Sequence, residues 1–155
     1  MRKKEVIPKR PIAPDYKYNN PTVTKFINYI MKDGKKSVAR KVVYDALDIV
    51  QKNTKKDPME IFDGAIKNIS PTLEVKTKRI GGANYQVPHQ VKGDRRLILA
   101  MRWIITASKN KKGMPMAEKL ATELTNAYNN TGDAIKKKED TERMARANRA
   151  FAHFA

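Results

Sequence analysis

The chain has 155 residues, of which 33 are lysine or arginine and 16 are aspartate or glutamate, so its net charge is +17 and its pI is near 10.1. Because 40% of the residues are hydrophobic, we expect one folded domain and not a disordered basic tail. Its positive charge indicates a basic surface that binds a polyanion, for which nucleic acid is the leading candidate. The absence of cysteine excludes disulfides, thiolate zinc sites and thiol nucleophiles.

The first residues predict an extended basic arm. The first 20 residues hold six basic side chains and three prolines, without helical periodicity. Mixing of Pro, Tyr and Lys or Arg favours an arm that orders on RNA over a solvated, floppy terminus.

Two short helices follow the arm. Asn20-Pro21 combines an N-cap with a favoured first helical residue and predicts a helix that ends at Asp33-Gly34. The second helix opens at Lys35-Lys36-Ser37 and has a helical apolar stripe. Its first turns carry four cations that the helix dipole disfavours: Lys35, Lys36, Arg40 and Lys41. A nearby phosphate explains them best, and a solvated helix face is the alternative.

A third helix leads into a β-hairpin. Asp57 and Glu60 occupy the cap and capping-box positions of the helix, which Ser70-Pro71 ends. Around Gly81-Gly82, residues 72–91 then alternate as in two antiparallel strands. The apolar or amphipathic faces of the two strands are expected at Leu73, Val75 and Thr77, and at Tyr85, Val87 and His89. Since two strands are marginal alone, the hairpin must lean on the helices at its base and on an anionic partner at its tip.

Three more helices complete the chain. The segment from Arg95 to Ser108 is apolar almost all round and predicts a central core helix, whose Arg102 reaches the surface or meets a phosphate. A basic loop and a helix over Met116 to Tyr128 follow. The last helix starts near Gly132-Asp133 and is expected to run to the terminus, its distal half protruding as a basic tail.

Together these elements predict a mainly α fold, a six-helix bundle with one protruding two-stranded antiparallel β-hairpin. We expect an arm over residues 1–19 and a single helical RNA-binding domain over 20–155, with hairpin 72–91 and C-terminal helix 133–155. Basic clusters occur at six sites: the arm, the junction of the first two helices, the hairpin, both ends of the core helix and the last helix. They suit a folded RNA that wraps several faces better than a straight DNA duplex.

Catalysis has little support. His89 and His153 each stand alone, and a strand rather than a helix follows Gly81-Gly82, so these glycines form a turn and not a phosphate cradle. We expect no enzyme activity, no cofactor and no metal. No apolar run approaches the roughly 18 residues of a membrane span, and no signal peptide is visible, so we expect a cytosolic protein without a membrane partner.

Four collinear motifs resemble a known family. They are NPTVTKFINYIMKDGKKSVARKVVYDA (residues 20–46), RIGGANYQVP (79–88), RRLILAMRWI (95–104) and MARANRAFAHF (144–154). With PDYKY (14–18) before them, they resemble the bacterial small-subunit ribosomal protein seven family over essentially the whole chain. The resemblance implies a primary binder of the 3′ major domain of small-subunit rRNA that nucleates assembly of the subunit head, located in cytoplasmic ribosomes.

The resemblance also implies which residues meet RNA. We expect rRNA contacts at Arg2, Lys3, Lys4, Lys9, Arg10, Lys35, Lys36, Lys76, Lys78, Arg79, Arg95, Arg96, Arg102, Lys109, Lys111 and Lys112. Exit-site tRNA and mRNA are expected near Gly82, Ala83, Asn84, Tyr85, Arg143 and Arg149. Neighbouring head and platform proteins are the other implied partners.

Two alternatives stay open. An architectural DNA-binding protein also combines a helical body with a basic β-ribbon, although such ribbons need an apolar wedge and this tip is Gly-Gly-Ala-Asn-Tyr. A translational repressor that binds its own message is compatible with the ribosomal role, and the sequence does not separate the two.

Overall fold

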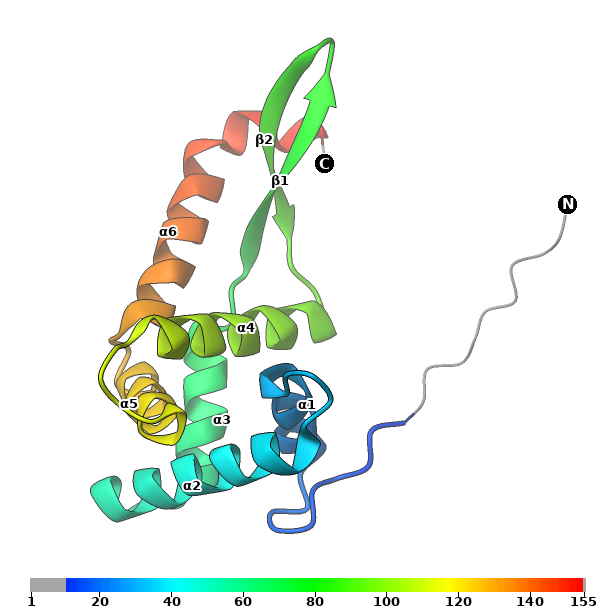
Figure 1. Cartoon of the computed structure of the whole chain (residues 1–155). Helices are drawn as coiled ribbons and strands as arrows, with labels where there is room; N and C mark the ends of the chain where they lie inside the picture. Colours follow the sequence, from blue (N-terminus) through cyan, green and yellow to red (C-terminus); the bar gives the residue numbers. More distant parts are fainter. Residues whose placement is uncertain (1–10, 155) are drawn as a thin grey trace, which may run out of the picture.

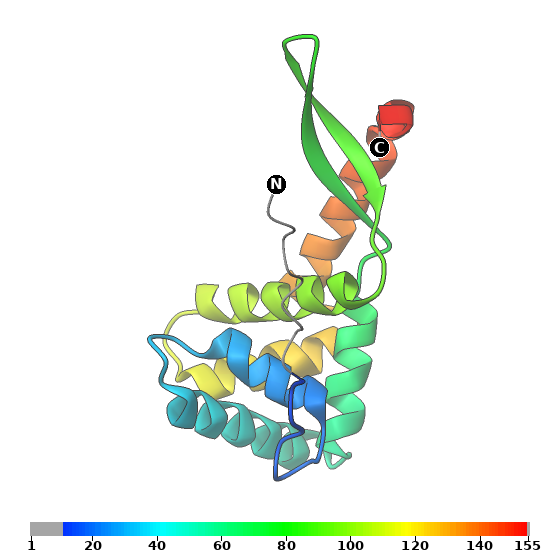
Figure 2. The ribbon, with the colours of Figure 1, turned by 90° about the vertical axis from the view of Figure 1, so that its right-hand side faces the viewer.

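The chain folds into a helical body from which a hairpin and one helix project. The computed structural model describes residues 11–154, and the expected mainly α fold with one antiparallel hairpin is confirmed. Helices α1 to α5 form the body, and the hairpin and α6 rise from the same side of it (Figures 1 and 2). The elements are α1 (Pro21–Ile30), α2 (Lys36–Thr54), α3 (Pro58–Ile69), β1 (Leu73–Ile80), β2 (Ala83–Gln90), α4 (Asp94–Asn110), α5 (Met116–Tyr128), α6 (Asp133–Ala147) and the 3₁₀ helix η1 (Arg149–Phe154).

Local capping sets where α1 and α3 begin. The Asn20 side chain accepts a hydrogen bond from the Thr22 amide at 2.8 Å, and Asp57 accepts one from the Met59 amide at 3.0 Å. Both caps were expected. Glu60 has a different partner from the one its position predicts, because it accepts a hydrogen bond from the Tyr128 hydroxyl at 3.0 Å and thereby ties α3 to α5.

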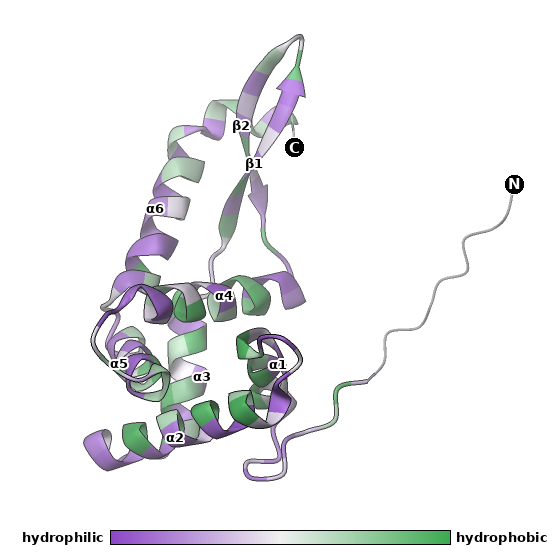
Figure 3. Ribbon diagram, in the orientation of Figure 1, coloured by the Kyte–Doolittle hydropathy of each residue, from purple (hydrophilic) through white to green (hydrophobic). Residues whose placement is uncertain are grey.

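Apolar faces of the five body helices meet in one core, and hydrophilic residues dominate α6 and much of the hairpin (Figure 3). Phe26 of α1 and Phe62 of α3 pack edge to face, 5.4 Å between ring centroids. Helix α4, expected as the central core helix, contributes Met101 and Ile104 to this core, whereas its Ile98 and Leu99 are only half-buried.

The hairpin turns tightly and carries different chemistry on its two faces. Gly81 and Gly82 take the positive φ of 56° and 89° that a two-residue turn needs, and Ile80 pairs with Ala83 across it. Directly opposed residues share a face, so Lys78 and Tyr85 point to the same side. The turn sets the register, and the register decides which side chains share a face. The predicted apolar set of β1, which begins at Leu73, therefore lies on the opposite face of the hairpin from the set of β2, which begins at Tyr85.

The end of the chain bends back onto the hairpin. The α-helix α6 stops at Ala147, instead of continuing to residue 155 with a free distal half, and η1 follows. Phe151 and Phe154 of η1 lie with ring centroids 5.2 Å and 5.9 Å from that of Tyr85. The Lys78 ammonium also donates to the Phe154 carbonyl at 2.7 Å. The bend packs the rings of Tyr85, Phe151 and Phe154 against one another and thereby reduces their exposure to water, whereas a solvated tail would leave them exposed.

One buried carboxylate fixes the segment before α1. Asp15 accepts hydrogen bonds from the backbone amides of Lys17, Tyr18 and Asn20 and from the Tyr44 hydroxyl of α2, at 2.8–3.0 Å. Burial alone raises the pKa of Asp15, but these donors outweigh burial and hold the pKa below its ordinary value. Residues 15–20 thus form a turn attached to α2, while residues 1–10 lie outside the described residues.

Asp15→Asn should lower the free energy of unfolding by about 2 kcal/mol, because an amide cannot accept from all four donors. The folded-state pKa of Asp15 lies below the unfolded value near 3.9, so the wild-type advantage is full above that pH and disappears as the pH falls through the lowered pKa. Urea unfolding across pH measures this. Asp48→Asn, which breaks only the exposed pair with Lys17, is the control and should cost less than about 1 kcal/mol. An Asp15 effect that grew on acidification would contradict this assignment.

Candidate nucleic-acid interface

The loop between α1 and α2 presents three exposed lysines: Lys32, Lys35 and Lys36. Within the described chain none of them pairs with a carboxylate. The helix that follows has no acidic residue in its first turn and no side-chain cap, so its first amides lack a side-chain acceptor. Lysines beside open helix amides attract an anion such as an RNA phosphate.

The hairpin base is held by a buried acid between two cations. Glu74 is 9% exposed, with Arg95 donating to its Oε2 from Nε and Nη2 at 3.2 Å and 2.9 Å, and with the Lys76 ammonium 3.3 Å from its Oε1. Burial alone raises the pKa of Glu74, but Arg95 and Lys76 outweigh it and lower the pKa. Arg96 donates from Nε to the Pro71 carbonyl at 3.1 Å. These predicted RNA-contact residues thus also attach the hairpin to α4.

A basic stripe runs along the outer side of α4. Arg95, Arg102 and Lys109 are exposed and seven residues apart, so they lie on nearly the same side of the helix. The Arg102 guanidinium lies 5.6 Å from the centre of the Tyr29 ring, so its charge reaches the surface over an aromatic face. The sequence placed these cations at separate sites, and the helix joins them in one line.

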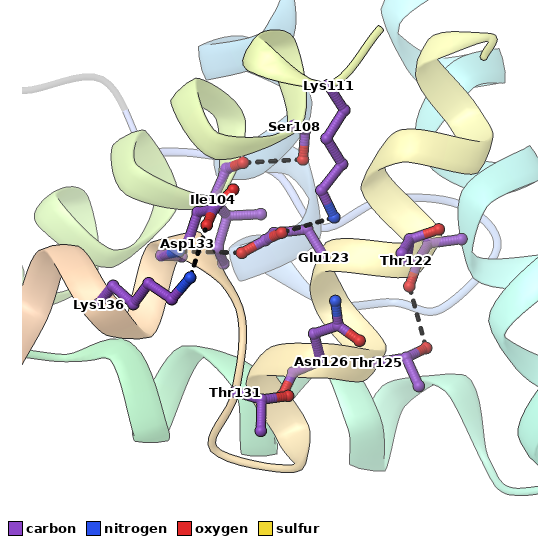
Figure 4. A network of polar contacts seen from close by, with 12 residues as sticks. Ile104, Ser108, Lys111, Thr122, Glu123, Thr125, Asn126, Thr131, Asp133 and Lys136 are labelled. Carbon is purple, nitrogen blue, oxygen red and sulfur yellow. Dashed lines mark hydrogen bonds and ion pairs between the residues drawn. The ribbon is translucent and has the colours of Figure 1, made fainter. Parts of the chain in front are cut away.

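Lys111 and Lys112 are neighbours in sequence with different surroundings. The Lys111 ammonium lies 2.7 Å from Oε2 of the fully buried Glu123, whose Oε1 accepts from the Ala134 amide at 2.9 Å (Figure 4). Glu123 thereby joins α5, the loop after α4 and the start of α6. Gly132 has no Cβ that would crowd Glu123, since one would stand 2.9 Å from Oε1. Lys112 is exposed and has no ion partner in the described part of the chain.

The hairpin tip and the C-terminal end lie side by side. Gly82, Ala83 and Asn84 are exposed at the tip, whereas Tyr85 is half-buried against η1 rather than freely exposed. Arg79 is exposed without an ion partner among residues 11–154, and Arg149 is likewise exposed. Arg143 pairs with Asp140 at 2.6 Å. Contact between β2 and η1 thus brings the predicted residues of the hairpin close to Arg149 (Figure 1), while Arg143 lies on α6.

The remaining predicted RNA residues are Arg2, Lys3, Lys4, Lys9 and Arg10, and they lie outside the described residues. The others form three groups, the α1–α2 loop, the hairpin base with the α4 stripe, and the hairpin tip with the C-terminal end, while Lys111 and Lys112 lie in the loop after α4. Sequence reasoning missed the buried acids Asp15, Glu74 and Glu123 that position these groups. The partners that decide their burial come in part from distant segments: Tyr44 for Asp15, Arg95 for Glu74, and Lys111 and Ala134 for Glu123.

The described residues show no constellation for catalysis or metal binding. No group of three or more His, Asp or Glu side chains there could hold a metal ion. His89 is half-buried on β2, and Nδ1 of His153 lies 2.9 Å from the Ala150 carbonyl. Across residues 11–154, no helix combines the length and apolarity needed to span a bilayer.

Comparison with known proteins identifies the family of the chain. A family model described as "Ribosomal protein S7p/S5e" matches residues 1–149. The chain belongs to the ribosomal protein S7p/S5e family. The "Small ribosomal subunit protein uS7" of Chloroflexus aggregans is 56% identical over 154 residues, covering 99% of this chain and 98% of that protein. Proteins of the same name from Desulfatibacillum aliphaticivorans and Thermotoga maritima are 54% and 58% identical, over 99% and 94% of both chains.

Membership in the S7p/S5e family confirms several expectations. The protein is a structural component of the ribosome, located in the cytoplasm, and not an enzyme. The family gives no support to an architectural DNA-binding protein. Individual RNA contacts stay predictions.

Substitutions of Lys111 and Lys112 should have different effects on the free energy of unfolding. Lys111→Met leaves the buried Glu123 charge without its partner and should cost about 3 kcal/mol of unfolding free energy. Lys112→Met, the matched control, should change stability by less than about 0.5 kcal/mol. Urea unfolding of both variants at pH 7 makes the comparison, and equal stabilities would remove the structural role of Lys111.

Proposed function

We propose that this small-subunit ribosomal protein binds the 3′ major domain of small-subunit rRNA directly and nucleates assembly of the subunit head. The observation that carries the proposal is the placement of exposed cations without ion partners in the described chain on three separated groups: Lys32, Lys35 and Lys36 of the α1–α2 loop, Arg102 and Lys109 of the α4 stripe, and Arg79 near the hairpin tip. A folded RNA can contact such groups simultaneously, and each cation that neutralises a phosphate releases counterions.

Within this proposal the cations differ in role. Lys35, Lys36, Arg102, Lys109 and Lys112 act mainly on phosphates, because the described chain gives them no carboxylate partner. Arg95, Arg96 and Lys76 contact RNA while holding the hairpin base, and their exposed atoms stay available. Lys111 contributes mainly through Glu123. The arm residues Arg2, Lys3, Lys4, Lys9 and Arg10 belong to the same proposed interface.

The hairpin tip and the C-terminal end are proposed to lie beside exit-site tRNA and mRNA. Both lie away from the helical body, and the tip projects beyond the C-terminal end (Figure 2). The body buries its core without the distal half of the hairpin, since the buried apolar residues of this region, Val87, Pro88 and Val91, lie at its lower part. The distal half is therefore free to reach a neighbour. Head and platform proteins are proposed as further partners.

Affinity for a 3′ major-domain RNA fragment should fall steeply with salt. Neutralising about six to ten phosphates costs roughly three to five decades between 50 and 200 mM salt on DNA-derived slopes, with a gentler slope for RNA. Binding to the fragment and to duplex DNA of equal length is measured at several salt concentrations. We expect preference for the fragment at physiological salt. Equal affinity for both, or a flat salt dependence, would remove the basis of this proposal.

Removing the hairpin tip should cost rRNA binding no more than the one phosphate contact of Arg79, and it should disturb exit-site tRNA retention. Joining Lys78 to Tyr85 through Asn-Gly deletes residues 79–84 and keeps the Tyr85 and Lys78 contacts to η1. Hydrogen-bonded and non-hydrogen-bonded residue pairs alternate along an antiparallel ladder. Because the deletion removes two pairs, the pair next to the new turn is of the same kind as the pair next to the original turn.

Assembled subunits carrying this deletion are compared with wild type for tRNA retention and reading-frame maintenance. Tyr85→Ala, with a full-length hairpin, is the control for loss of the η1 contact alone. If both functions equal wild type while assembly fails, the tip is an assembly contact instead.

A further inference from the structure

A cavity of about 240 Å³ opens between the segment before α1 and the first two helices. Its lining comes from the turn at residues 13–16, from Thr24 and Ile27 of α1, and from Lys36 and Arg40 of α2. The volume is several times the roughly 30 Å³ of a water molecule in the liquid. The cavity therefore has room for a planar ring or for a phosphate group.

Two cations stand at this cavity without a carboxylate partner in the described chain. Lys36 and Arg40 are exposed and four residues apart in the first turns of α2. Like charges at this spacing near a helix N-terminus oppose helix stability. Asp15 also lines the cavity, but three backbone amides and the Tyr44 hydroxyl already use its oxygens. The positive charge is thus not neutralised from within.

An exposed aromatic ring stands at the same place. Tyr16 is 78% exposed, although it is large and apolar. Its backbone is part of the turn that Asp15 fixes, and its ring meets Tyr44 edge to face at 5.6 Å. The Arg40 guanidinium lies 5.9 Å from the ring centre. An aromatic ring and a guanidinium plane are the two surfaces on which unpaired bases stack.

We propose that this cavity binds one unpaired nucleotide of the rRNA, its base stacked on Tyr16 and its phosphate contacted by Lys36 and Arg40. The proposal rests on the proposed function and adds Tyr16 and Arg40 to the RNA-contacting residues. The nucleotide is unpaired because a base inside a duplex has its faces covered by its neighbours. RNA fits better than an acidic protein segment, since a carboxylate uses the cations but not the exposed ring.

Binding of the 3′ major-domain fragment is measured for Tyr16→Leu and Tyr16→Phe. Tyr16→Leu removes the ring and should weaken binding about tenfold or more, at an unchanged salt slope. Tyr16→Phe retains the ring and should stay within about twofold of wild type. Urea unfolding of both variants is measured alongside.

Single charge variants test the phosphate. Lys36→Gln and Arg40→Gln should each reduce the salt slope by about one. Lys52→Gln, an exposed lysine about 24 Å away on the same helix, is the matched control and should leave slope and affinity unchanged.

The outcomes separate this site from the proposed function. If wild type binds the fragment steeply with salt and Tyr16→Leu binds equally well, the nucleotide site is wrong and the proposed function stands. If wild type fails to bind, the proposed function itself falls. If Tyr16→Phe loses as much affinity as Tyr16→Leu, or if the loss of affinity is accompanied by an equal loss of unfolding free energy, Tyr16 has a structural role and does not stack on a base. If the Tyr16, Lys36 and Arg40 variants bind RNA normally but assemble poorly with neighbouring ribosomal proteins, the cavity binds an acidic protein segment instead.

Discussion

The structure depends on supporting a two-stranded ribbon that is marginal by itself in water. Three contacts supply the support: Glu74 with Arg95 at the base, Glu142 accepting from the Thr72 amide and hydroxyl at 3.1 and 3.0 Å, and Tyr85 against η1. They draw α4, α6 and the C-terminal end to the hairpin. Helix α6 and η1, which follows the bend after Ala147, both contact the hairpin.

Charge is divided between structure and surface. Three buried acids hold the architecture together: Asp15 before α1, Glu74 at the hairpin base and Glu123 between α5 and α6. Each lies among donors from separate segments, which lowers the pKa of Asp15 and Glu74 despite burial. Most cations, by contrast, stay at the surface, where self-repulsion costs stability that a polyanion partner restores. The net charge of +17 thus belongs to the outside of the molecule.

Local chemistry made much of the fold predictable. Asn20 and Asp57 cap their helices through contacts within two residues, and Gly81-Gly82 turn the chain within the turn itself. Helical spacing of apolar residues predicted α1 to α5 because each helix buries one stripe. The four collinear motifs predicted the family, and the match over residues 1–149 confirms it.

The sequence by itself determined helices α1 to α5, the hairpin, the basic character and the family, since these follow from neighbouring residues or from motif order, whereas the end of α6 at Ala147 and the η1 turn did not follow from it. Only the tertiary structure decided that Lys111 serves Glu123 while Lys112 stays free of ion partners in the described chain, and that Tyr85 meets Phe151. It also joined Arg95, Arg102 and Lys109 in one stripe and placed Tyr16 beside Arg40. Burial and charge pairing depend on segments far apart in sequence, and no local pattern contains that information.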